Sequence, residues 1–317
     1  MAGGHAQGLA WRGLVAALLA AVCVAAAAQP KEGSSVGIDT TDFAGRHLLL
    51  PGVLWEPAGP AKGAVVLVHG SGGWSNFREG HYGRAFRAAG YAALAIDTFG
   101  PRGFVSTTED QSQISALQMT RDAFAARRFL IDKGYAAERL AVMGFSKGGT
   151  VAMYAADRNF LPKQTERFAL AIPFYAGCNA RPRTPQPASV VFMALGEKDD
   201  YTGIRPCQDV AADFVRAGGT ITVKVYPDSS HGFDGNPTLT AMTRLRFVEN
   251  YKDCVVYIEE DGRYSYGTKT YAAGDAALLA DMRGSCVKKG ANIWTNTTQK
   301  DAATRDVIEF LDHNFAK

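Results

Sequence analysis

The chain has 317 residues, of which 47% are hydrophobic and 21% are charged, and its formal net charge is +3. This composition excludes a wholly disordered chain, because enough apolar surface is present to offset the entropy that folding costs. The nearly balanced charge, without long basic runs, also argues against a nucleic-acid-binding protein. A chain of this length fits one large domain or two modest ones.

Residues 1–28 have the pattern of a secretory signal peptide. Arg12 precedes an apolar stretch, residues 13–28, that ends in small side chains. This order predicts cleavage near Ala27 or Ala28, and therefore export to the periplasm or the medium, without stable membrane insertion of the mature chain. An uncleaved membrane anchor is the alternative, although the stretch is at the short edge of what can span a bilayer.

Cleavage would leave four cysteines, and an even number in an exported chain indicates two disulfides. Of the three possible connectivities we favour the sequential one, Cys178–Cys207 and Cys254–Cys286. A zinc site is a weaker alternative, because no C-x-x-C spacing occurs. We therefore expect no bound metal.

Short apolar runs alternate with longer segments of helical period along the rest of the chain. The segments expected as strands are 47–50, 52–55, 64–68, 91–96, 140–143, 168–174, 190–195 and 220–226. The segments expected as helices are 77–89, 112–133, 147–156, 206–217 and 302–314. This alternation predicts a parallel sheet with helices on both faces, within a single α/β domain that spans residues 29–317.

Residues 249–298 depart from this alternation and are rich in tyrosine. Segments 255–260 and 263–266 flank Asp261-Gly262, which is a two-residue hairpin signal. We expect an insertion at about 249–298, before the last helix, held by the disulfide Cys254–Cys286.

The segment Gly144-Phe145-Ser146-Lys147-Gly148 lies between an expected strand and an expected helix. A G-x-S-x-G motif in that setting is typical of a nucleophile elbow. Gly144 and Gly148 leave room where the strand and helix backbones crowd, and the Ser146 hydroxyl projects above the sheet. The unpaired N–H groups of the helix N-terminus also favour a developing negative charge.

A nucleophilic serine needs a base and an orienting acid. His231 is the candidate base, because it lies in a loop after the expected strand 220–226. Asp199 follows strand 190–195 and is the candidate acid, which would fix the imidazole tautomer and stabilise the imidazolium. Asp200 is the second choice for this role, and Glu197 the third.

The glycine-rich turn His69-Gly70-Ser71-Gly72-Gly73-Trp74 follows the expected strand 64–68 directly. Such a turn can aim a backbone N–H at a substrate oxygen, together with the N–H of Lys147. Ser71 is our choice for the donor in this turn, and Gly72 is the alternative. A dinucleotide-binding loop would need glycine or alanine at position 75, where the chain has Ser75.

Taken together, the motifs resemble the α/β-hydrolase fold and, more narrowly, the dienelactone hydrolase family. The resemblance rests on V-H-G-S-G-G-W (68–74), I-D-T-F-G-P-R-G (96–103), G-F-S-K-G-G (144–149), G-E-K-D-D (196–200) and H-G-F (231–233). It implies a three-layer fold with a mostly parallel, roughly eight-stranded sheet, and hydrolysis of esters or lactones without a cofactor. Ser146 matches the nucleophile, Asp199 the acid and His231 the base. The namesake enzymes resemble G-x-C-x-G at the elbow, so the serine is a departure from the family pattern.

We therefore predict an exported serine hydrolase that cleaves a small carboxylic ester or lactone through an acyl-enzyme. Four residues near the motifs are candidates for the substrate pocket: Trp74, Arg102, Phe145 and Phe233. Arg102 either binds a substrate carboxylate or, as we favour, pairs with Asp97 in its own loop. Two alternatives stay open, a peptidase or amidase on the same three residues and a non-catalytic binding protein on a hydrolase scaffold. The sequence indicates no particular oligomeric state.

Overall fold

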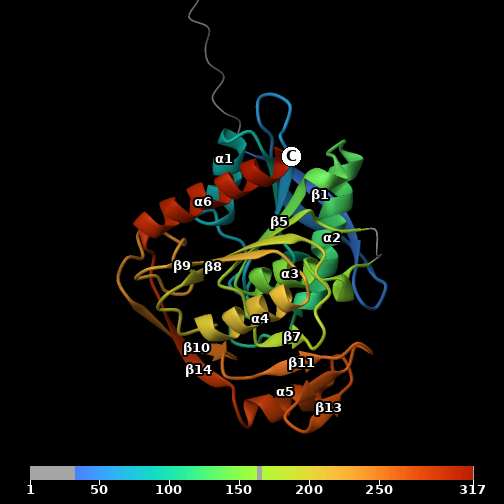
Figure 1. The fold of residues 1–317 in the computed structure, drawn as a ribbon, viewed down its shortest axis with the longest axis vertical. Helices are drawn as coiled ribbons and strands as arrows, with labels where there is room; N and C mark the ends of the chain where they lie inside the picture. Colours follow the sequence, from blue (N-terminus) through green and yellow to red (C-terminus); the bar gives the residue numbers. More distant parts are fainter. Residues whose placement is uncertain (1–32, 163–165, 317) are drawn as a thin grey trace, which may run out of the picture. The chain divides into compact units, whose positions relative to one another are not determined.

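The computed structural model describes residues 33–162 and 166–316, and Figure 1 shows their helices and strands along the chain. Residues 1–28, which the sequence predicts to be a signal peptide, lie outside the described residues. Among the residues that are described, no helix is both long enough and apolar enough to cross a membrane.

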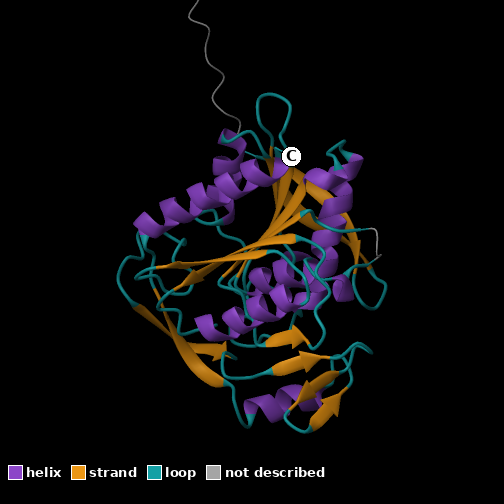
Figure 2. Cartoon of the chain, in the orientation of Figure 1, coloured by secondary structure: helices purple, strands orange, loops and turns teal. Residues whose placement is uncertain are grey.

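An eight-stranded sheet with the strand order β1-β2-β4-β3-β5-β6-β8-β9 is the centre of the fold (Figure 2). Its strands are β1 (Ser34–Thr41), β2 (His47–Trp55), β3 (Ala64–Val68), β4 (Ala92–Ile96), β5 (Leu140–Phe145), β6 (Leu170–Phe174), β8 (Val190–Gly196) and β9 (Ile221–Tyr226). Strand β2 is antiparallel to β1 and β4, and all other neighbours are parallel. The predicted mostly parallel sheet is confirmed.

Helices cover both faces of this sheet and complete three layers. They are α1 (Glu79–Ala88), α2 (Ala116–Asp132), α3 (Lys147–Ala155), α4 (Ile204–Arg216) and α6 (Thr297–Phe315). Alternate side chains of a strand point to opposite faces. Accordingly, Val65 and Leu67 of β3 pack in the core beneath α1 and α6, whereas Val66 and Val68 pack in the core beneath α2, α3 and α4.

The beginning of the sheet differs from the sequence prediction in two ways. Strand β1 was not predicted, because its sequence has no apolar run and it lies at the sheet edge, where only Ile38 and Thr40 are buried. Segments 47–50 and 52–55 were predicted as separate strands, but β2 continues through Pro51. Proline has no N–H for a strand ladder, which is why its position suggested an interruption; in the structure it is paired with Gly37 of β1.

A second group of elements lies between β9 and α6. Strands β10 (Thr243–Asn250) and β14 (Lys288–Ile293) pair with each other. A small sheet of β11 (Val256–Ile258), β12 (Tyr264–Tyr266) and β13 (Lys269–Tyr271) adds β7 (Ala180–Pro182) from the main domain as its fourth strand. Helix α5 (Ala276–Arg283) follows β13 (Figure 1). Strand β10 starts before the expected insertion at 249–298, and α6 starts inside its last residues.

The hairpin of β11 and β12 forms where the sequence predicts it, but the predicted two-residue turn at Asp261-Gly262 is wrong. Glu259 donates its N–H to the carbonyl of Arg263 at 2.8 Å, so the loop consists of residues 260–262. Gly262 ends this loop with a φ of +81°. Glycine adopts this left-handed conformation at low cost, which suits the last position of a three-residue hairpin loop.

Two disulfides link Cys178 to Cys207 and Cys254 to Cys286, the sequential pairing that the sequence favours. The first ties the chain after β6 to α4, and the second closes part of the group between β9 and α6. Their sequence separations are 29 and 32 residues. Closing loops of this length stabilises the fold by roughly 3–4 kcal/mol each, through restriction of the unfolded chain.

The contact between α1 and α6 predicts a pH-dependent stability. His81 of α1 lies 3.0 Å from the hydroxyl of Thr304 of α6, and burial, followed by repulsion from Lys300, lowers the pKa of His81 to about 4. The unfolded chain takes up this proton near pH 6.5. The free energy of unfolding therefore falls as the pH drops from 6.5 to 4.

We expect the free energy of unfolding to fall by about 1–2 kcal/mol less in His81→Gln than in the wild type over this pH range. The range is reduced because solvent screens a partly exposed group. Urea unfolding at pH 7 and at pH 4.5 measures it. His47→Gln is the matched control, because the His47 side chain is 68% exposed on the sheet edge. An unchanged pH dependence in His81→Gln would rule out this origin of the effect.

Candidate active site

Ser146 lies in a sharp bend between β5 and α3, with φ +56° and ψ −115°. A positive φ in a residue other than glycine is strained and persists only where the surroundings impose it. The surroundings are close here, because a Cβ at Gly144 would clash with the carbonyl of Gly148, and one at Gly148 with the carbonyl of Val68. The two glycines thus allow the strand and helix to meet as the G-x-S-x-G motif predicts.

The structure brings Ser146, His231 and Asp199 together in one hydrogen-bonded chain. His231 Nε2 lies 2.9 Å from Ser146 Oγ, and His231 Nδ1 lies 2.9 Å from Asp199 Oδ2. The His231 and Asp199 side chains are 7% and 3% exposed. The three residues come from three different strand ends, β5, β8 and β9, which the parallel sheet aligns at one edge.

Asp199 is held as a carboxylate by its neighbours. Its Oδ1 accepts the N–H groups of Tyr201 and Thr202 at 2.8 and 2.9 Å, and its Oδ2 accepts the Thr202 hydroxyl at 2.8 Å. Burial acts to raise the pKa of Asp199, but His231 and the hydrogen bonds from Thr202 outweigh it and lower the pKa below its ordinary value. These contacts favour the carboxylate form of Asp199 next to the imidazole.

Asp200 and Glu197, the other candidate acids, face elsewhere. Asp200 accepts the backbone N–H and the side-chain amide of Asn292 on β14, at 2.8 and 2.6 Å. Glu197 accepts the N–H of Asp228 at 2.9 Å. Of the three acidic candidates, only Asp199 reaches the imidazole, and Asp200 instead fastens β14 to the main domain.

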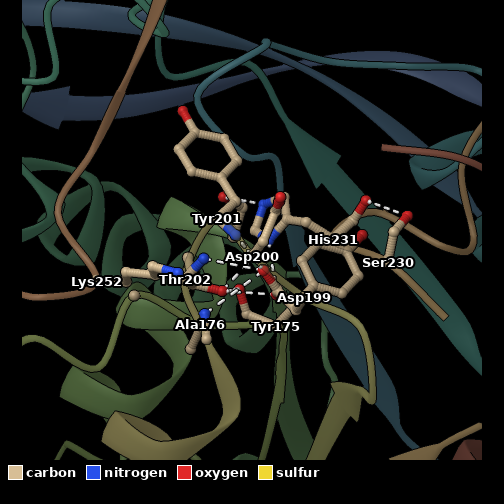
Figure 3. Close-up of polar contacts among 12 residues, drawn as sticks. Tyr175, Ala176, Asp199, Asp200, Tyr201, Thr202, Ser230, His231 and Lys252 are labelled. Atoms are coloured by element: carbon tan, nitrogen blue, oxygen red, sulfur yellow. Dashed lines mark hydrogen bonds and ion pairs between the residues drawn. The ribbon is translucent and has the colours of Figure 1, made fainter. Parts of the chain in front are cut away.

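Sequence reasoning missed three residues around the imidazole (Figure 3). The rings of Tyr175 and Tyr201 pack against the His231 ring, with centroids 4.8 and 4.7 Å away. The hydroxyl of Thr202 lies 3.2 Å from His231 Nδ1. The only available signal was the local pattern Asp199-x-x-Thr202, because an aspartate often accepts hydrogen bonds from the turn that follows it.

Ser71, Ser146 and Lys147 line the same cavity, of about 280 Å³. The turn that carries Ser71 packs closely against the bend at Ser146. A Cβ at Gly70 would lie 2.9 Å from the Phe145 carbonyl and 3.1 Å from Ser146 Cβ. The amide of Lys147 is in the first turn of α3, where N–H groups have no carbonyl partner within the helix. Gly72, the alternative to Ser71, is not part of the cavity wall.

The side chain of Lys147 has a role that the sequence did not suggest. Its Nζ donates to the hydroxyl of Thr107 and to the carbonyls of Gln111 and Ile114, each at 2.9 Å. Burial lowers the pKa of Lys147 to about 7, against the attraction of Asp110 and Glu249. Lys147 thus fastens the segment before α2 to the elbow.

The four predicted pocket residues are not in the cavity wall. Phe145 and Phe233 are fully buried in the core beneath α1 and α6. Phe145 is the last residue of β5, directly before Ser146, and it packs in the same core as Ala141 and Met143 because alternate strand residues share a face. Trp74 is 39% exposed and lies outside the cavity.

Arg102 also lies outside the cavity, and it does not pair with Asp97, the partner that we favoured. It donates to both carboxylate oxygens of Asp122 on α2, at 2.8 and 3.0 Å, and to the carbonyl of Thr98. Asp97 instead accepts N–H groups of its own loop, from Phe99 and Gly100. The tertiary fold, not proximity in sequence, chooses the partner of Arg102.

The group between β9 and α6 supplies much of the cavity wall. Its lining residues are Glu249, Tyr251, Lys252, Tyr264, Leu279 and Met282. Glu249 connects this wall to the main domain, because it accepts the N–H of Gln111 at 3.0 Å and the guanidinium of Arg283 at 2.7 Å. The tyrosine-rich composition of residues 249–298 was the one sequence signal for this role.

A mostly parallel eight-stranded sheet, with a strand–turn–helix bend after β5, places the chain in the α/β-hydrolase fold class. A model of the dienelactone hydrolase family matches residues 50–241. The chain belongs to this family and is a hydrolase.

Solved structures of similar fold share little sequence with the chain. A dienelactone hydrolase-type protein of Klebsiella pneumoniae is 19% identical, with a TM-score of 0.49 over 63% of this chain and 88% of that one. Esterase 2 of Thermogutta terrifontis is 14% identical, with a TM-score of 0.49 over 66% and 86%. A puromycin-hydrolyzing peptidase of Mycobacterium tuberculosis is 18% identical, with a TM-score of 0.48 over 64% and 36%. No curated protein matches the chain.

Proposed function

We propose that this hydrolase cleaves carboxylic esters or lactones with Ser146 as nucleophile, His231 as base and Asp199 as orienting acid. The observation that carries the proposal is the chain of hydrogen bonds from Asp199 through His231 to Ser146. In such a chain the imidazole removes the hydroxyl proton, and the carboxylate stabilises the imidazolium that forms. The chain's membership of the dienelactone hydrolase family supports ester or lactone substrates.

In the first half of the reaction, Ser146 Oγ attacks the carbonyl carbon while His231 Nε2 accepts its proton. The carbonyl oxygen becomes negative, and the amides of Ser71 and Lys147 are our proposed donors to it. One donor of this kind typically contributes roughly 3 kcal/mol of transition-state stabilisation. The imidazolium then gives its proton to the alkoxide as the bond between that oxygen and the carbonyl carbon breaks. The alcohol leaves, and the acyl group stays bound to Ser146 Oγ.

In the second half, water replaces the alcohol. His231 removes a proton from the water as it attacks the acyl carbon, and then returns that proton to Ser146 Oγ as the acid departs. A lactone would pass through the same steps, with its alcohol and acid ends in one molecule. The steps of this proposed reaction need neither a redox change nor a cofactor.

We also propose that the protein is exported and that residues 1–28 are a signal peptide removed on the way. Two observations support this proposal. The sequence of residues 13–28 has the apolar core and small-residue end of such a signal. Disulfides such as Cys178–Cys207 and Cys254–Cys286 persist mainly in oxidising compartments outside the cytosol.

A fluorophosphonate probe tests the proposed nucleophile, because it reacts with serines that an adjacent base activates. We expect the folded wild-type protein to be labelled and Ser146→Ala to remain unlabelled under the same conditions. Intact-mass spectrometry measures the labelling and peptide mapping locates it. Equal labelling of the two proteins, or none of the wild type, would falsify the assignment.

A further inference from the structure

A second cavity, of about 590 Å³, lies next to the first and has more than twice its volume. Its walls come from α2, from the segment around Phe160 and from the hairpin of β11 and β12. Neither Ser146 nor any other proposed catalytic residue lines it.

The two cavities share two wall residues, Leu117 of α2 and Tyr264 of β12. A side chain that lines two cavities separates them, so the two volumes adjoin at this pair. Both side chains are partly exposed. The space beside Ser146 and the second cavity therefore lie on the two sides of Leu117 and Tyr264.

The chemistry of the second cavity favours an uncharged, apolar occupant. Aromatic and aliphatic side chains form the larger part of its wall, among them Phe43, Phe124, Phe160 and Ile258, and the rest of the wall is polar. Its charged side chains balance in number, because Arg121 and Arg128 stand against Glu259 and Glu260. Three of them have partners: Arg128 pairs with Glu166, Glu259 pairs with Arg183, and Arg121 donates to the Thr41 hydroxyl and lies over the Phe43 ring. An anionic substrate group would have to displace one of these contacts, whereas an alkyl or aryl group would not.

We propose that the natural substrate is an ester with one long apolar arm, which passes Leu117 and Tyr264 and ends in the second cavity. This inference rests on the proposed esterase function. The first cavity has less than half the volume of the second. A short ester fits there, but an arm of about ten carbons or more extends beyond it. The second cavity would then act as a specificity site for chain length.

Two series of esters test this proposal: p-nitrophenyl esters with acyl chains from C2 to C12, and acetate esters of alcohols with the same chain lengths, followed by pH-stat titration. The arm enters from either the acyl or the alcohol side. We expect kcat/KM to rise roughly tenfold or more between C6 and C12 in one of the two series, because each added methylene is removed from water.

Filling the second cavity should abolish this rise. Ala273 is exposed and lines the second cavity but not the first, so Ala273→Trp places an indole there without touching the proposed catalytic residues. Ala272→Trp is the matched control, because the neighbouring Ala272 is also exposed and does not line the cavity. Thr184→Trp fills the cavity from a different segment and covers the case in which Ala273→Trp does not fold.

The expected pattern is a loss of about tenfold in kcat/KM for the C12 ester in Ala273→Trp and Thr184→Trp only. The C2 ester should change less than twofold in every variant. A flat or falling dependence on chain length in both series of the wild type, or full C12 activity in both filled variants, overturns the long-arm proposal while ester cleavage stands. Absence of turnover for every ester, C2 included, would instead remove the proposed function and this inference with it.

Discussion

Ser146→Ala is expected to lower kcat for a short p-nitrophenyl ester by roughly 10⁴- to 10⁶-fold, which is the largest effect we predict for a single substitution. The hydroxyl is the atom that would form the bond to the acyl carbon, and no other side chain can take its place 2.9 Å from His231 Nε2. The residual rate should come only from substrate binding and the amide donors. Initial rates over a range of ester concentrations separate kcat from KM.

The folded state should survive this substitution. Among the described residues, the only hydrogen-bond partner of Ser146 Oγ is His231, and alanine is no more strained than serine at φ +56°. We expect the melting temperature and the near-ultraviolet circular dichroism to remain close to those of the wild type. A well-folded Ser146→Ala that keeps more than about a hundredth of the wild-type kcat would be incompatible with a nucleophilic serine at this position.

The second large effect distinguishes the roles of two adjacent carboxylates, Asp199 and Asp200. We expect Asp199→Asn to lower kcat by about 10⁴-fold, because an amide in place of the carboxylate holds the imidazole in the wrong tautomer and cannot stabilise the imidazolium. Asp199 lies 2.9 Å from His231 Nδ1. Steady-state kinetics at pH 7 to 8 measure the change, and Ser146 labelling should slow in parallel.

Asp200→Asn is the matched control for this experiment, since it makes the same chemical change one residue away. Asp200 binds Asn292 on β14 rather than the imidazole, so kcat should stay within a few-fold of the wild type. The free energy of unfolding should fall by about 1 kcal/mol through the weakened hydrogen bonds. The reverse result, with Asp200→Asn inactive and Asp199→Asn active, would show that the wrong acid has been chosen.

Much of the fold was predictable because its signals are local. The buried strands β3 and β4 are continuous apolar runs, and they occur within a residue of the segments predicted. The bend at Ser146 was also predictable, because only glycine fits at positions 144 and 148, where the strand and helix backbones meet. The edge strand β1 carried no such signal, since a strand with one solvated face and few apolar side chains resembles a loop in sequence.

The alternating α/β order, the elbow that presents Ser146 and the chain order in which an acid and a histidine follow it could all be predicted from the amino-acid order alone. The three-dimensional fold was needed to show that Asp199 rather than Asp200 lies beside the imidazole, that Arg102 pairs with Asp122, and that side chains of the segment after β9 line the cavity at Ser146. These two kinds of feature differ in the range of the interactions that set them. A backbone bend or a strand depends on residues a few positions apart, whereas the direction of a side chain and its partner depend on which segments the fold brings alongside it.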